Sequence, residues 1–222
     1  EKSVSGNLSP HRTRLGLYRL SEKAQLLAAP EIEYSGASTS VELTDTECPD
    51  FVMPNQDDMD YALFSLDEKS LLNAEKALTL LPTPLARYGV WTILSHMVRS
   101  QEMPVQEFLR MAIAAAAVEK DDLLLGLMVS TRSSLYSYYK GYLTPEQREE
   151  LAPSLETMIW QRLEKSAAGS SAQLNFFDFY TNVVQTTQGL DRLHGMVTKN
   201  ELPKGITLDP DRRWQLITTL AS

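Results

Sequence analysis

Five carboxylates and a lysine gather in one short run of this sequence, Pro54 to Ser70, which reads PNQDDMDYALFSLDEKS. Clustered carboxylates can hold a calcium ion or supply a general acid and base. An EF-hand loop starting at Asp57 would need ligand oxygens where the run has Met59 and Tyr61, and a glycine where it has Ala62. We therefore favour a structural interpretation, in which the acids belong to a turn before a strand (Asp57, Asp58 and Asp60) and to a helix N-terminus (Asp67 and Glu68).

Other reactive side chains are scattered along the chain. The histidines, His11, His96 and His194, form no HExxH or similar ligand pair, and no flanking charge marks Cys48 as an activated thiolate. The sequence contains no GxGxxG, GxxxxGKS/T or GxSxG motif, which excludes the familiar phosphate loops and the serine nucleophile elbow. We assign no catalytic, cofactor-binding or metal-ligating residue in this chain.

Two aromatic clusters could line a binding surface instead. The helical spacing of the first favours a place in the core (Phe176, Phe179, Tyr180 and Val183). The second fits either an amphipathic rim or an ordinary helix end (Tyr136, Tyr138, Tyr139 and Tyr142).

The composition narrows the class of protein. A length of 222 residues with 43% hydrophobic residues predicts one or two globular domains. The net charge of −8 argues against nucleic acid and anionic membranes as partners, because both attract clustered Lys and Arg. The single cysteine excludes an internal disulfide and fits a reducing compartment such as the cytoplasm.

Short β signals occupy the first 66 residues. Extended patterns cover residues 14–20, 31–34, 38–43 and 61–66, and turn residues such as Pro30, Gly36 and Pro49 separate them. After Leu66 the apolar period changes from two to about 3.6, which predicts helices only.

Helix starts are legible from their capping residues. We predict helices over residues 68–81, 85–99, 105–118, 122–139, 146–165, 174–184, 190–198 and 210–221. In the same order, the residues that open them are Asp67, Thr83 with Pro84, Pro104, Asp121, Thr144 with Pro145, Ser170, Thr187, and Asp209 with Pro210. Pro153 predicts a kink or break within its helix.

These starts recur about every 17–25 residues, the spacing of HEAT-like helical pairs. We predict a mainly α chain, with an antiparallel β-sandwich domain over residues 1–66 and an α–α superhelix over 67–222. Either domain can be incomplete at its outer end. The sandwich is small enough to need support from the helices or from segments that precede it.

Several segments resemble, in order, zinc aminopeptidases of the aminopeptidase N family. The run Asn55–Ala62 with Leu66–Ser70 is similar to the family's "LND-DLxYAxxxLDxxS". Residues 8–12 with 16–18 resemble "RPHRxxxGLY", residues 168–170 with 173–174 resemble "PGSDxQL", and residues 205–214 resemble "GLxxDxDLRW". Residues 85–87, 91 and 97–99 look like the family's first long helix pair.

The resemblance implies a four-part enzyme, of which this chain takes the third part, a β-sandwich, and much of the fourth, a helical bowl. Zinc, its HExxH ligands and the GxMEN element that holds the free amine would belong to a preceding catalytic domain. That domain and peptide substrates are the partners we expect. The family pattern also includes Arg213 and Trp214, which we interpret as a helix-anchoring ion pair and a buried indole.

Three functional hypotheses follow. The chain is a non-catalytic C-terminal portion of a zinc aminopeptidase, which covers and gates the active-site chamber; or a free-standing helical-repeat scaffold that binds another protein; or, least favoured, a carboxylate-based hydrolase that uses residues 57–68.

Overall fold

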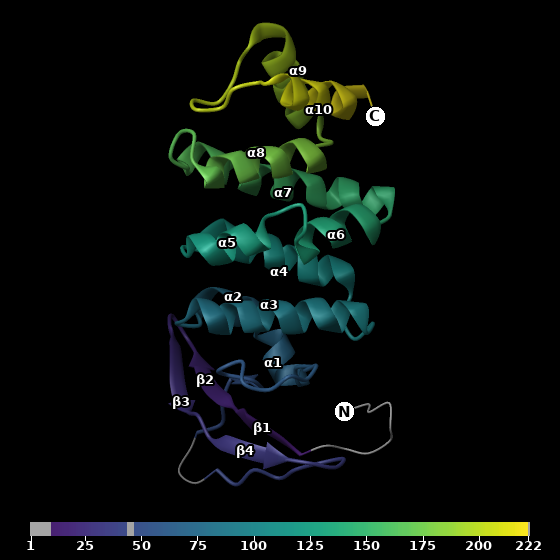
Figure 1. Cartoon of the computed structure of the whole chain (residues 1–222). Helices are drawn as coiled ribbons and strands as arrows, with labels where there is room; N and C mark the ends of the chain where they lie inside the picture. Colours follow the sequence, from purple (N-terminus) through teal and green to yellow (C-terminus); the bar gives the residue numbers. More distant parts are fainter. Residues whose placement is uncertain (1–9, 44–46, 222) are drawn as a thin grey trace. The chain divides into compact units, whose positions relative to one another are not determined.

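The structure is a computed structural model, which describes residues 10–43 and 47–221. The chain separates into two compact units, Glu1–Pro104 and Val105–Ser222, which we describe one at a time. As predicted, the chain is mainly α, with a small antiparallel β segment near its N-terminus (Figure 1). The predicted domain boundary after residue 66 stays a prediction.

Two small antiparallel sheets form the β segment of the first unit. One pairs β1 (His11–Arg14) with β4 (Glu31–Tyr34), and the other has the order β3-β2-β5, with β2 (Gly16–Leu20) between β3 (Ala24–Ala28) and β5 (Phe51–Met53). In the first sheet His11 lies opposite Tyr34 and Thr13 opposite Ile32, so these four side chains share one face.

Part of the β prediction was wrong. Residues 38–43 and 61–66 form no strand, although the first segment alternates polar with apolar residues and the second is almost entirely apolar. Neither segment has a hydrogen-bonded neighbour strand among the residues that the structure describes. Conversely, β3 forms from an Ala- and Leu-rich run with little intrinsic preference for strands, because it pairs with β2 across a tight turn.

Three helices complete the first unit: α1 (Glu68–Leu72), α2 (Ala74–Leu80) and α3 (Pro84–Arg99). Their core side chains pack with those of β2 and β5, including Tyr18, Phe51 and Leu94, each at most 1% exposed. Gly89 in α3 lets the methyl group of Met53 approach so closely that a Cβ would lie 2.3 Å from it. The sheet β3-β2-β5 is thus anchored on helices.

The second unit contains α4 (Val105–Val118), α5 (Asp122–Met128), α6 (Ser134–Gly141), α7 (Pro145–Lys165), α8 (Ser171–Val183), α9 (Thr187–Lys199) and α10 (Pro210–Ala221). Neighbours along the chain pack together, α7 with α8 and α9 with α10, as helical pairs do (Figure 1). The predicted core cluster around Phe179 is buried, with Phe176, Tyr180 and Val183. No helix in the described part of the chain is long and apolar enough to cross a bilayer.

Two predicted helices are broken. The helix predicted over 68–81 is interrupted at Asn73, whose side chain donates a hydrogen bond to the carbonyl of Lys69. The helix predicted over 122–139 is interrupted between Met128 and Ser134, because Ser133 caps a new helix by accepting from the amide of Tyr136. In contrast, α7 runs without a break through Pro153, which is exposed.

The expectation for Arg213 and Trp214 was wrong. Trp214 is 67% exposed, and Arg213 donates a hydrogen bond to the carbonyl of Val197 rather than to a carboxylate. Helix α10 instead turns Leu216 into the core, and Gln215 and Thr219 bond to Thr181 of α8. Trp214 lies two residues before Leu216 on α10, a spacing that places the two side chains on different sides of a helix.

Candidate functional site

The acidic run converges on β1 and β4. His11 Nδ1 lies 2.8 Å from one oxygen of Asp60, and the hydroxyl of Tyr34 donates to the other over 2.6 Å. The rings of His11 and Tyr34 are stacked, with centroids 5.2 Å apart. Because an ionised carboxylate only accepts hydrogen bonds, His11 donates from Nδ1. The three side chains form an aspartate–histidine–tyrosine cluster.

The charge state of Asp60 follows from its surroundings. The side chain is only 7% exposed, and burial alone would raise its pKa. The hydrogen bonds from His11 and Tyr34 and the charge of His11 outweigh burial, so the pKa of Asp60 is lowered below its usual value. An ionised Asp60 therefore ties the turn to both strands of the first sheet.

The rest of the turn is bound to β1 as well. Arg14 donates to Asp57 over 2.7 Å, and the buried Asn55 accepts hydrogen bonds from the amides of Met59 and Asp60 and from the hydroxyl of Thr13. The acids of the turn thus have the structural role that their spacing predicts.

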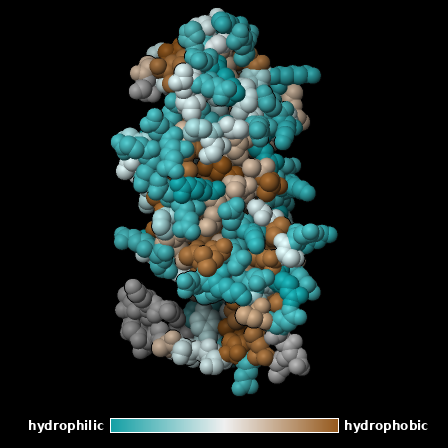
Figure 2. All heavy atoms as spheres, turned by 180° about the vertical axis from the view of Figure 1, so that it is seen from behind, coloured by the Kyte–Doolittle hydropathy of each residue, from teal (hydrophilic) through white to brown (hydrophobic). Residues whose placement is uncertain are grey.

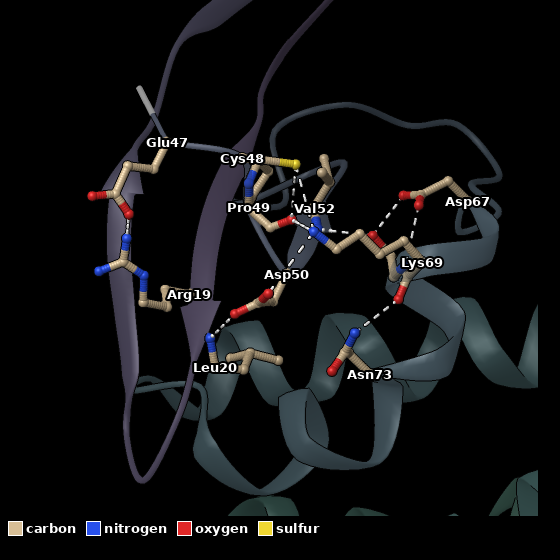
Figure 3. Close-up of polar contacts among 11 residues, drawn as sticks. Arg19, Leu20, Glu47, Cys48, Pro49, Asp50, Val52, Asp67, Lys69 and Asn73 are labelled. Carbon is tan, nitrogen blue, oxygen red and sulfur yellow. Dashed lines mark hydrogen bonds and ion pairs between the residues drawn. The ribbon is translucent and has the colours of Figure 1, made fainter. Parts of the chain in front are cut away.

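Asp67 caps α1 and connects it to a strand. Its carboxylate accepts from the amide and, over 2.5 Å, from the hydroxyl of Ser70, and that hydroxyl accepts from the amide of Val52 in β5 (Figure 3). Burial would raise the pKa of Asp67, but the hydrogen bonds from Ser70 prevail and lower it. The predicted N-cap therefore also joins a helix to the sheet.

Lys69 binds the loop before β5. Its ammonium donates to the carbonyl of Pro49 over 2.6 Å and lies 3.5 Å from the sulfur of Cys48 and 3.8 Å from Asp50 (Figure 3). Asp50 in turn accepts from the amide of Leu20 over 2.9 Å. The role of this lysine was not predicted from the sequence, because its partners lie about 20 residues away and leave no local signal.

Two grooves flank the segment that follows the turn. The sheet-side groove, of about 830 Å³, lies between the shared face of β1 and β4 and residues 61–65, with residues 35–39 also lining it. The helix-side groove, of about 270 Å³, lies between residues 61–64 and α3, where His96 lines it. Both are formed within the first unit.

A polar cluster in the second unit was also missed. Glu156 of α7 is 3% exposed and accepts from the amides of Gln185 and Thr186 and from the hydroxyl of Thr186, the N-cap of α9. Nearby, Arg192 stacks on Trp160 with its guanidinium carbon 4.6 Å from the ring centroid. Glu156 occupies an apolar position of its helix, which is the signal that could have revealed it.

The described side chains do not fit a zinc site. No three His, Cys, Asp or Glu residues among them come together closely enough to hold a metal ion. His11 is engaged with Asp60, His96 lines the helix-side groove, and His194 is exposed on α9. We derive no catalytic step from these residues.

Comparisons with known proteins identify the chain's relationship. The family model of the ERAP1-like C-terminal domain matches residues 51–222. Aminopeptidase N of Streptomyces lividans is 26% identical over 218 residues, which cover 97% of this chain and 25% of that protein. The chain thus spans about a quarter of the length of this curated relative. From residue 51 onward, the chain belongs to the ERAP1-like C-terminal domain family, as the C-terminal region of an aminopeptidase N family protein.

Proposed function

We propose that this chain is the non-catalytic C-terminal portion of a zinc-dependent aminopeptidase that removes N-terminal residues from peptides. Its helices form a bowl that covers the active-site chamber and restricts which substrates enter. The observation that carries the proposal is the family match over residues 51–222, together with the similarity to an aminopeptidase along 97% of the chain.

The contacts of three carboxylates in the acidic run favour a structural role for them rather than a catalytic one. Asp57, Asp60 and Asp67 bond to Arg14, to His11 and Tyr34, and to Ser70, respectively. A hydrolase that used these carboxylates for catalysis would need at least one of them directed at substrate. In the proposed enzyme a zinc ion held by a separate catalytic domain activates the attacking water.

The division of roles is tested by activity and metal content. We expect the 222-residue chain to hydrolyse no aminoacyl p-nitroanilide and to bind no stoichiometric zinc, whereas the full-length parent does both. Hydrolysis by the isolated chain would overturn the proposal. Asp57→Asn in the parent should leave zinc content and turnover largely unchanged. If this variant folded but lost activity, the result would instead favour the carboxylate-based hydrolase.

The gating role needs a separate experiment in the full-length parent. A Gly-Ser-Gly insertion after Pro104, between the two compact units, should alter the ratio of kcat/KM for long peptides to that for an aminoacyl p-nitroanilide. The same insertion after Thr207, which is exposed in the loop between α9 and α10, is the matched control. An unchanged ratio, with zinc retained in both variants, would contradict gating.

One observation favours the alternative of a protein-binding scaffold. Trp214 and Ile217, three residues apart on α10, are 67% and 39% exposed, which is unusual for an indole and an isoleucine side by side. An upstream HExxH in the same reading frame would eliminate a free-standing scaffold, and a start codon close to Glu1 would support it.

A further inference from the structure

The loop after α7 and the loop after α9 meet in the second unit. They contribute to two of the segments that carry the family resemblance, residues 168–174 and 205–214. Gly169 and Gly205 both have a positive φ, of 74° and 94°. A Cβ at Gly205 would lie 2.4 Å from the amide nitrogen of Gly169, so the two backbones approach more closely than any side chain at position 205 allows.

Gln173 binds both loops at once. Its side chain lies in the first turn of α8 and is 3% exposed. Oε1 accepts a hydrogen bond from the amide of Gly169 over 2.7 Å, and Nε2 donates one to the carbonyl of Lys204, 31 residues along the chain, over 3.0 Å. These two bonds, together with the contact between Gly169 and Gly205, form what we call the latch.

Helix α10 has little buried apolar surface to hold it in place. Among its described residues only Leu216 is buried. Polar groups connect it to α8: Thr219 donates to the carbonyl of Thr181 over 3.1 Å, and Arg212 lies 3.9 Å from Asp178. In Figure 2 the part of the second unit that α9 and α10 form, at the top of the view, shows mainly hydrophilic residues on the visible face. A helix packed in this way opens locally at a low cost in free energy.

Helix α9 is held independently of the latch. Glu156 binds its N-cap residue, Thr186, and α9 buries Leu193 and Met196. At the other end of α9, Asn200 adopts the left-handed conformation with a φ of 57°, and the helix ends there. The packing therefore changes at Asn200: α9 is tied to α7, whereas the chain beyond it depends on the latch.

We propose that residues 201–221 form a strap that opens and closes against α8 as one unit, and that the latch holds it closed. When the latch breaks, the strap turns about Asn200 and carries α10 away from α8. Because Trp214 and Ile217 lie on α10, the closed latch also fixes the position of this exposed apolar pair. The strap does not depend on whether the helices cover a catalytic site.

Amide hydrogen exchange of the 222-residue chain tests whether the strap opens as a unit. Gln173→Ala removes both hydrogen bonds of the latch, so the protection of α10 amides such as that of Ile217 should fall at least about tenfold. Amides in the middle of α8 and α9, such as those of Phe179 and Leu193, should keep their protection. Asn175→Ala, at an exposed position of α8, is the matched control and should leave α10 unchanged.

Two results of this experiment would overturn the proposal. Equal losses of protection in α8, α9 and α10 would show that the second unit opens only as a whole. Unchanged protection of α10 in Gln173→Ala would show that the latch does not hold it.

Gln173→Glu distinguishes the bonds of the latch from the size of the side chain. An ionised glutamate still accepts from the amide of Gly169 but has no donor for the carbonyl of Lys204, whereas a protonated glutamate can donate again. The protection of α10 relative to that of α8 should therefore rise as the pH is lowered, and more in this variant than in the wild-type chain. The same pH dependence in both proteins would contradict the assigned bonds.

A double substitution tests whether the glycine contact belongs to the same latch. Gly205→Ala places a methyl group against Gly169 and should open α10 as Gln173→Ala does. Because both changes break one latch, the double variant should open α10 by much less than the product of the two single effects. Multiplying effects would show two independent contacts and refute a single latch.

Discussion

Glu156 offers the sharpest test of how the second unit is held together. The carboxylate is 3% exposed and accepts hydrogen bonds over 2.8, 2.9 and 2.5 Å from the amides of Gln185 and Thr186 and from the Thr186 hydroxyl. It thereby ties the middle of α7 to the start of α9, where a negative charge also interacts favourably with the helix dipole. Glu156→Ala removes the acceptor but leaves its three donors.

The expected cost follows from those donors. Each buried donor left without an acceptor costs about 1–3 kcal/mol, and water entering the vacated space satisfies some of them. We therefore expect Glu156→Ala to lower the free energy of unfolding by about 3–5 kcal/mol. Glu156→Gln keeps one acceptor oxygen at the same place, and it should cost about 1–2 kcal/mol.

Urea unfolding followed by far-UV circular dichroism measures the global effect, and amide exchange within α9 measures the local one. Glu150→Ala in the same helix is the matched control. Glu150 pairs with Arg110 over 2.6 Å, but both side chains are 57% exposed, so its loss should cost less than about 1 kcal/mol. Equal effects of the alanine substitutions at 156 and 150 would refute the reasoning.

Three further predictions concern single side chains. Because the pKa of Asp60 is lowered on folding, its contribution to stability is present above about pH 4 and is lost as the pH falls through the folded value. Asp60→Asn should therefore make the free energy of unfolding fall less steeply as the pH is lowered below about 4. Parallel curves of unfolding free energy against pH for the two proteins would contradict this. Trp214→Ala should cost less than about 1 kcal/mol in the isolated chain, whereas Phe179→Ala, at a fully buried site, should cost about 3–5 kcal/mol in the same thermal unfolding assay. Asp67→Ala should cost about 0.5–2 kcal/mol and Asp67→Asn clearly less, because asparagine also caps; equal losses would point to charge rather than the cap bond to Ser70.

Local signals explain why much of the helical architecture could be predicted. Thr83 and Thr144 cap α3 and α7 as their sequences indicate, and Gln147 completes a capping box. A cap needs only a side chain and an amide three residues away, so its chemistry is contained in a few consecutive residues. The breaks at Asn73 and Ser133 were missed because the same residue types are also tolerated inside helices.

The candidate site likewise has a part that could be predicted from the sequence and a part that could not. The assignment of Asp67 as a cap and of the earlier acids as turn residues needed only the run itself. The partners of Asp60 did not follow from it, because His11 lies 49 residues away and reaches Asp60 only through the pairing of β1 with β4. Glu156 and Thr186 are 30 residues apart, so their bond depends on how α7 packs against the start of α9.

The sequence by itself determined the change from strands to helices, most helix starts, the buried aromatic cluster around Phe179 and the family relationship, because each depends on the order and spacing of nearby residues. Only the tertiary structure decided that Trp214 is exposed and that residues 61–66 have no neighbour strand among the described residues. It also decided that Asp57 and Asp60 bind side chains of β1 and β4. Burial and strand pairing depend on what lies opposite a residue in space, and a periodic pattern specifies a face without specifying what covers it.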